Sequence, residues 1–89
     1  MADWSLLRRL CNTPGVSGAE DQVREIILEE IRPYADSIEI TPLGNLIAVK
    51  KGRERARKKL MLDAHMDEVG FLVTFIREDG LLKMTAAGG

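Results

Sequence analysis

The 89 residues can form one small domain at most, and a chain of this size buries only about two-thirds of its unfolded surface. Apolar residues make up 45% and charged residues 30%, while the net charge of -1 provides no general attraction to nucleic acid or an anionic membrane. The single cysteine, Cys11, excludes an internal disulfide framework, and no apolar run approaches the roughly 20 residues that span a bilayer. The start MADWSLLRRL lacks the apolar core of a signal peptide, so a cytoplasmic location is expected.

Two amphipathic helices are predicted in the first third of the chain. Residues 3–11 place apolar side chains at helical spacing, and the sequence NTPGVSG then breaks the helix. Ser17 and Glu20 have the spacing of a capping box, which predicts the start of a second helix. Pro33 marks its end, and its apolar stripe comprises Val23, Ile26, Ile27 and Ile31.

From Ser37 the pattern changes from helical to extended. SIEIT and NLIAV flank the turn sequence PLGN, so residues 37–50 are predicted to form a hairpin or two neighbouring strands. The basic segment KKGRERARKK then connects to the next element. It is either a patch for phosphate or nucleic acid or a solvated loop, and the lack of interleaved aromatic residues favours the loop.

Residues 59–67, KLMLDAHMD, are predicted to form a buried strand. Alternate side chains of a strand share one face, so one face would be wholly apolar. The opposite face carries Met61, Asp63, His65 and Asp67 and becomes polar only toward its C-terminal end. This pattern is typical of a strand in an α/β sheet whose end opens into a crevice, and the preceding helices agree with a layered α/β or α+β fold.

Residues 69–89 are predicted to form a hairpin whose edges remain unpaired. Asp79-Gly80 is the dipeptide preferred in a type I′ turn, in which both central residues have positive φ. Gly88 and Gly89 predict a turn leading onward. This part of the chain therefore predicts an interrupted fold with open strand edges.

The sequence Asp63-x-His65-x-Asp67 contains the only histidine of the chain. A neutral imidazole can bind zinc or cobalt through one nitrogen while a carboxylate accepts a hydrogen bond from the other. A catalytic zinc site needs about three protein ligands, which one histidine does not provide. From residue chemistry alone, the pattern is either part of a metal site or a structural histidine at a strand end.

The sequence LMLDAHMDEVGF closely resembles the first metal-binding strand of the tetrahedral metallo-aminopeptidases, metallopeptidase family 42. This family includes glutamyl and deblocking aminopeptidases and proteins once labelled endoglucanases. TPGVSGAE and PLGNLIAVKKG are similar to the family's loop before its second helix and to its strand pair. The resemblance covers essentially all 89 residues in order and corresponds to the N-terminal portion of a family member.

The resemblance implies a fold, a site and an activity. The fold is an α/β, zinc-aminopeptidase-like three-layer sheet domain, with residues 1–68 in its N-terminal part and residues 69–89 starting an inserted β-rich dimerisation domain. His65 corresponds to a ligand of one of two divalent metal ions, zinc or cobalt, and Asp67 to the catalytic aspartate that orients it. Full-length relatives remove N-terminal residues from peptide substrates as homo-oligomers built from dimers. The remaining ligands and the general base would follow the inserted domain, so this chain is expected to be inactive alone.

A second hypothesis is a stand-alone interaction module that associates through the exposed hairpin edge at residues 69–86. Cys11 is expected to be a small core residue rather than a nucleophile. Trp4, Phe71 and Phe75 are expected to pack rather than to line a substrate pocket. Glu68 is expected to face away from Asp67 and is therefore not assigned as a general base.

Overall fold

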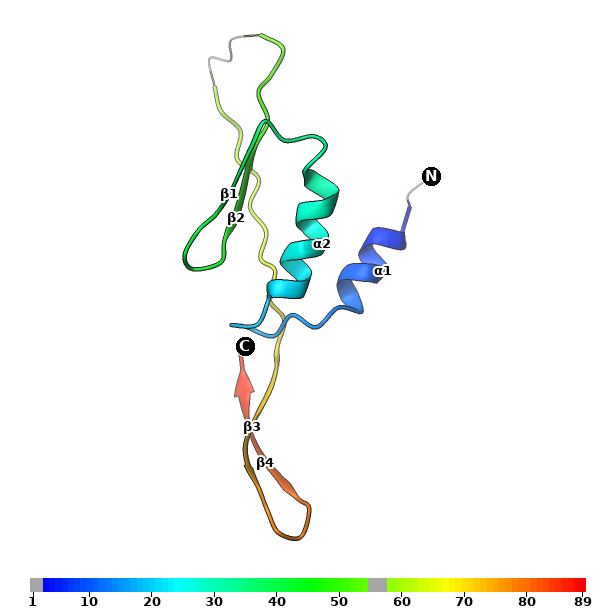
Figure 1. The fold of residues 1–89 in the computed structure, drawn as a ribbon, viewed down its shortest axis with the longest axis vertical. Helices are drawn as coiled ribbons and strands as arrows, with labels where there is room; N and C mark the ends of the chain where they lie inside the picture. The colour runs from blue at the N-terminus through cyan, green and yellow to red at the C-terminus, as the bar shows by residue number, and fades with distance from the viewer. Residues whose placement is uncertain (1–2, 55–57) are drawn as a thin grey trace.

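A computed structural model describes residues 3–54 and 58–89 as two helices and two separate two-stranded sheets (Figure 1). No helix among these residues is long and apolar enough to cross a membrane. The elements, in chain order, are α1 (Ser5–Cys11), α2 (Asp21–Ile31), β1 (Ser37–Ile40), β2 (Leu46–Val49), β3 (Gly70–Ile76) and β4 (Leu82–Ala87).

The helix α2 starts later than the capping-box spacing predicts. Its first residue is Asp21, Glu20 is the N-cap, and no side chain caps the helix. The Glu20 carboxylate instead accepts a hydrogen bond from the Gly18 N–H at 2.6 Å, outside the helix. The capping-box prediction was therefore wrong, because the acidic side chain closes the preceding turn. The predicted end was confirmed, since α2 stops at Ile31 before Pro33.

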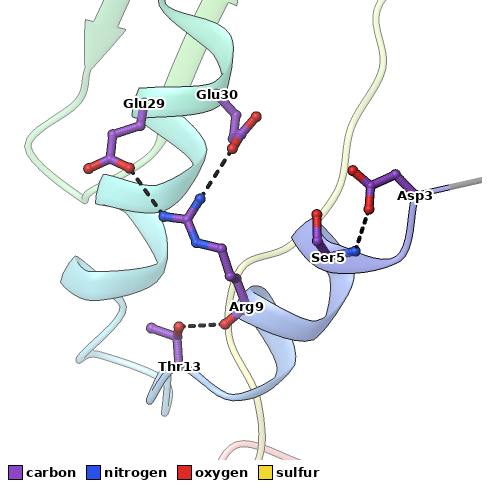
Figure 2. A network of polar contacts seen from close by, with 6 residues as sticks. All are labelled: Asp3, Ser5, Arg9, Thr13, Glu29 and Glu30. Atoms are coloured by element: carbon purple, nitrogen blue, oxygen red, sulfur yellow. Dashed lines mark hydrogen bonds and ion pairs between the residues drawn. The ribbon is translucent and has the colours of Figure 1, made fainter.

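Helix α1 is held to α2 by polar contacts between side chains (Figure 2). The Arg9 guanidinium donates to Glu29 and to Glu30, both at 3.2 Å. The carbonyl oxygen of Arg9 accepts a hydrogen bond from the Thr13 hydroxyl at 2.6 Å, just after α1 ends. These side chains are about half exposed, so the pairs orient α1 more than they stabilise it.

Both predicted hairpins form, and loops of the same construction close them. β1 pairs antiparallel with β2, and β3 pairs antiparallel with β4. In each loop a glycine N–H donates to the carbonyl three residues earlier, Gly44 to Thr41 at 2.8 Å and Gly80 to Arg77 at 3.0 Å. Both glycines have positive φ, 90° and 85°, as in a turn followed by a left-handed residue.

The type I′ assignment of the second hairpin was wrong. A type I′ turn needs positive φ at both central residues, whereas Asp79 has none and only Gly80 adopts it. The Asp79 carboxylate accepts from the Leu81 N–H at 3.1 Å and pairs with Arg77 at 3.0 Å. These contacts stabilise the longer loop.

Residues 59–67 are extended but do not form the predicted strand. Within the described residues, the segment joins no ladder, and an isolated parallel bridge pairs Val16 with Glu68 just beyond it. Leu60 and Leu62 are 88% exposed, so the predicted apolar face is uncovered. A strand requires a hydrogen-bonded neighbour, and these residues provide none for it. Of the basic connector, residues 55–57 lie outside the described residues, and the flanking residues form no helix or strand.

The described residues form a very small core. Its buried apolar side chains are Val23 and Leu28, both on α2, and Leu28 is not in the predicted stripe. The radius of gyration is 17.8 Å, against about 12 Å for a compact domain of this length. Cys11 is exposed, which corrects its expected place in the core. The expected packing of three aromatic side chains was also wrong, since each is more than half exposed: Trp4, Phe71 and Phe75.

Candidate metal site

The structure brings His65 and Asp67 together. The Nδ1 atom of His65 lies 3.0 Å from Oδ1 of Asp67 and 3.0 Å from its backbone carbonyl oxygen. The His65 side chain is 85% exposed, whereas that of Asp67 is 39% exposed. The imidazole is therefore oriented by its neighbour while most of the ring faces outward.

These contacts define the tautomer of His65. A carbonyl oxygen can only accept a hydrogen bond, so Nδ1 must carry the proton that it donates to Asp67. In the neutral ring, Nε2 then has a free lone pair. Metal-binding histidines commonly have this arrangement, in which a carboxylate or carbonyl holds one nitrogen and the other binds the ion. His65 thus has the chemistry of one metal ligand.

The residues beside Asp67 are attached to the loop that precedes α2. The Glu68 N–H donates to the Gly15 carbonyl at 2.9 Å, and the Gly15 N–H donates to Oε1 of Glu68 at 3.2 Å. This pairing was not predicted from the sequence. The signals available for it were Gly15 in the loop PGVSG and Gly70, which lies two residues after the site segment, residues 59–68.

Close packing against valine side chains explains both Gly15 and Gly70. A Cβ on Gly70 would lie 2.5 Å from Cγ2 of Val16, and one on Gly15 would lie 2.7 Å from Cγ2 of Val23. Cβ atoms in proteins essentially never come within 3.0 Å of a heavy atom outside their own residue and its chain neighbours. The two glycines thus allow the loop before α2 to lie against residues 66–70.

The described residues do not complete a metal site. Across residues 3–54 and 58–89, no three His, Cys, Asp or Glu side chains are grouped so that they could hold an ion. His65 and Asp67 have the chemistry of one ligand and its orienting group, whereas a catalytic zinc centre needs about three protein ligands. The arrangement can hold and orient an imidazole, but by itself it cannot hold an ion tightly.

The chain is similar to aminopeptidases in sequence and in structure. The family model of the M42 glutamyl aminopeptidases matches residues 44–89. A lysyl aminopeptidase of Pyrococcus furiosus is 39% identical over 90 residues, which cover 100% of this chain and 25% of that protein. A TET aminopeptidase from a marine sediment thaumarchaeon superposes with a TM-score of 0.83 at 37% identity, over 94% of this chain and 23% of that one.

A third similar protein is an oligomer. The dodecamer PhTET1-12s superposes with a TM-score of 0.79 at 38% identity, over 100% of this chain and 26% of that one. The described residues thus form part of an α/β aminopeptidase fold. The chain belongs to the M42 glutamyl aminopeptidase family and corresponds to the N-terminal portion of a family member. This confirms the resemblance found in the sequence. It spans about a quarter of the length of the relatives that it matches.

Proposed function

We propose that these residues are the N-terminal portion of a metal-dependent aminopeptidase that removes N-terminal residues from peptides. The observation that carries the proposal is the hydrogen bond from His65 Nδ1 to Asp67, which leaves Nε2 exposed in a segment matched by the family model. His65 would bind one divalent ion through Nε2. Asp67 would hold the ring in the binding tautomer and increase the basicity of the ligand.

The full centre would use two divalent ions, zinc or cobalt. When bound, they would supply an activated water for attack on the peptide carbonyl. The chain's own part would be to supply His65, its only histidine, as one ligand. We propose that the other ligands and the general base belong to residues outside these 89, and that the chain alone is therefore inactive.

We propose a domain boundary near residue 68. The bridge between Val16 and Glu68 joins the site segment to the helical part, whereas β3 and β4 pair with each other in a separate sheet. Residues 1–68 would belong to the catalytic domain and residues 69–89 would begin an inserted β domain used for dimerisation. By analogy with the dodecameric relative, the complete protein would be a homo-oligomer. We also propose a cytoplasmic location, on the sequence features alone.

The proposal is tested by binding and turnover in two proteins, the 89-residue chain and the complete protein. Cobalt(II) is titrated while its visible absorption is followed, and aminoacyl anilides are assayed with added cobalt or zinc. We expect turnover only in the complete protein. His65→Ala should abolish this turnover and should reduce the number of bound cobalt ions by one. Asp63→Ala is the matched control, because Asp63 also lies two residues from His65 but has no hydrogen bond to it among the described residues. Turnover by the short chain that His65→Ala abolishes would refute the proposed inactivity.

The second candidate function is a self-associating module. It is favoured by the hairpin β3–β4, on which large apolar side chains are exposed: Phe71, Leu72, Val73, Phe75, Ile76, Leu82 and Met84. Exposed strand edges of this kind pair with other chains. Light scattering of the 89-residue chain separates the two functions. One defined oligomer would favour the module, and polydisperse aggregates would favour a portion of a larger fold.

A further inference from the structure

We infer that Glu68 is a positioning residue for the His65–Asp67 pair, and that it acts by clamping the site segment to Gly15. The inference rests on the proposed function, because it concerns the same metal site. Glu68 is not placed against the imidazole itself. Its role follows from its two hydrogen bonds to Gly15, which lies in the loop before α2.

Glu68 satisfies both backbone polar groups of one residue. Its N–H donates to the Gly15 carbonyl oxygen at 2.9 Å, and its Oε1 accepts from the Gly15 N–H at 3.2 Å. Two hydrogen bonds between the same pair of residues fix their relative orientation as well as their separation. Gly15 is buried whereas Glu68 is exposed, so water competes with the side-chain bond on the Glu68 side more than on the Gly15 side.

Gly15 lies against the small core, which contains Val23. It is buried, and a Cβ there would lie 2.7 Å from Cγ2 of Val23 and 3.5 Å from the carbonyl oxygen of Met66. Val23 is 6% exposed and belongs to α2. Gly15 therefore lies against the two residues that flank Asp67, namely Met66 and Glu68, and relates their positions to the helix.

The clamp matters because the site segment has little other support. Among the described residues, 59–67 joins no ladder, and the bridge at Val16 and Glu68 lies directly after Asp67. The direction of the His65 ring depends on Asp67, through both its carboxylate and its carbonyl oxygen. A shift of the backbone at residues 66–68 would therefore turn Nε2 away from the ion.

The test uses Glu68→Ala and Glu68→Gln in the complete protein. The alanine removes the acceptor for the Gly15 N–H, whereas the glutamine keeps an oxygen at that place. In Glu68→Ala we expect faster amide exchange in peptides covering residues 13–18, measured by mass spectrometry. We also expect a fall in kcat of about 10- to 100-fold with KM little changed, and an altered cobalt(II) absorption spectrum. Glu68→Gln should restore most of the exchange protection and of kcat.

Glu25→Ala is the matched control, because Glu25 is exposed on α2 and has no side-chain hydrogen bond among the described residues. It should change neither exchange nor kcat. Unchanged exchange and kcat in Glu68→Ala would overturn the inference, as would a glutamine variant as impaired as the alanine. A lowered melting temperature with unchanged kcat and cobalt spectrum would also overturn it, because Glu68 would then serve folding alone.

The two proposals fail in different ways. A wild-type complete protein that neither binds cobalt nor cleaves anilides would overturn the proposed function, and the positioning role with it. A wild-type protein that does both, together with a fully active Glu68→Ala variant, would overturn the role of Glu68 only.

Discussion

The contact between Gly70 and Val16 predicts a compensating pair of substitutions. Gly70 is the first residue of β3, and its backbone does not require positive φ, so alanine is allowed there conformationally. Its Cβ would nevertheless lie 2.5 Å from Cγ2 and 3.3 Å from Cγ1 of Val16. Val16→Ala removes both of these carbons and leaves Cβ at 3.5 Å, which is ordinary contact.

The magnitudes follow from this geometry. Carbon atoms pack best at about 3.5–4.0 Å, so the alanine Cβ is about 1 Å too close to Cγ2, and overpacking of this kind costs about 1–3 kcal/mol. Val16→Ala deletes two methyl groups worth about 0.8 kcal/mol each when fully buried, and Val16 is half-buried, so its loss is about 0.8 kcal/mol. The double variant should lose only about as much as Val16→Ala alone.

The assay is urea unfolding of the complete protein, followed by circular dichroism, for the wild type, both single variants and the double variant. Gly52→Ala is the control. Among the described residues its Cβ would meet only the Glu54 carbonyl oxygen, at 3.7 Å, so its effect should stay within about 0.5 kcal/mol. A coupling free energy of about 1–3 kcal/mol is expected. Losses that simply add would refute the reasoning, since they would show that the loop and β3 do not touch.

Two further predictions concern helix α1. Arg9→Ala removes the exposed ion pairs to Glu29 and Glu30, so the free energy of unfolding should fall by less than about 1 kcal/mol. This difference from the wild type should vanish in high salt. A larger loss of stability that salt does not change would contradict the prediction. Hydrogen bonds from the Ser5 backbone N–H and from the Ser5 side chain lower the pKa of Asp3. The backbone hydrogen bond has the larger effect. The carboxylate therefore stabilises the start of α1 above the ordinary pKa of Asp, and this effect is lost as the pH falls through the lowered pKa. An NMR titration of the Ser5 amide should show the transition, and Asp3→Ala should abolish it.

Local sequence patterns predicted the elements whose partners are close in the chain. In both hairpins five residues separate the two strands, so alternation and turn glycines were sufficient. Helix α2 was found from its periodicity and from Pro33. The capping box failed because the Glu20 carboxylate accepts from the Gly18 N–H, two residues before it, instead of from the Ser17 N–H, three residues before it.

The segment at residues 59–67 shows why the rest could not be predicted in the same way. Its alternation of apolar and polar residues predicts what would surround it in a sheet, but pairing depends on a neighbouring strand. Residues 3–54 and 58–89 show no such strand beside it. The candidate site behaved differently. His65 and Asp67 are two residues apart on one face, so sequence reasoning placed them together, whereas the contact of Glu68 with Gly15 spans 53 positions and had no local signal.

The uncovered leucines of the site segment have a consequence for biosynthesis. In a protein of the relatives' length, about 270 residues follow these 89, and at about 5–20 residues per second their synthesis takes roughly 13–55 s. If a strand that pairs with residues 59–67 lies in that later part, Leu60, Met61 and Leu62 would leave the ribosome before it is made. The basic connector before them and the acids after them then act as gatekeepers, because charges that flank an apolar strand oppose aggregation of the nascent chain.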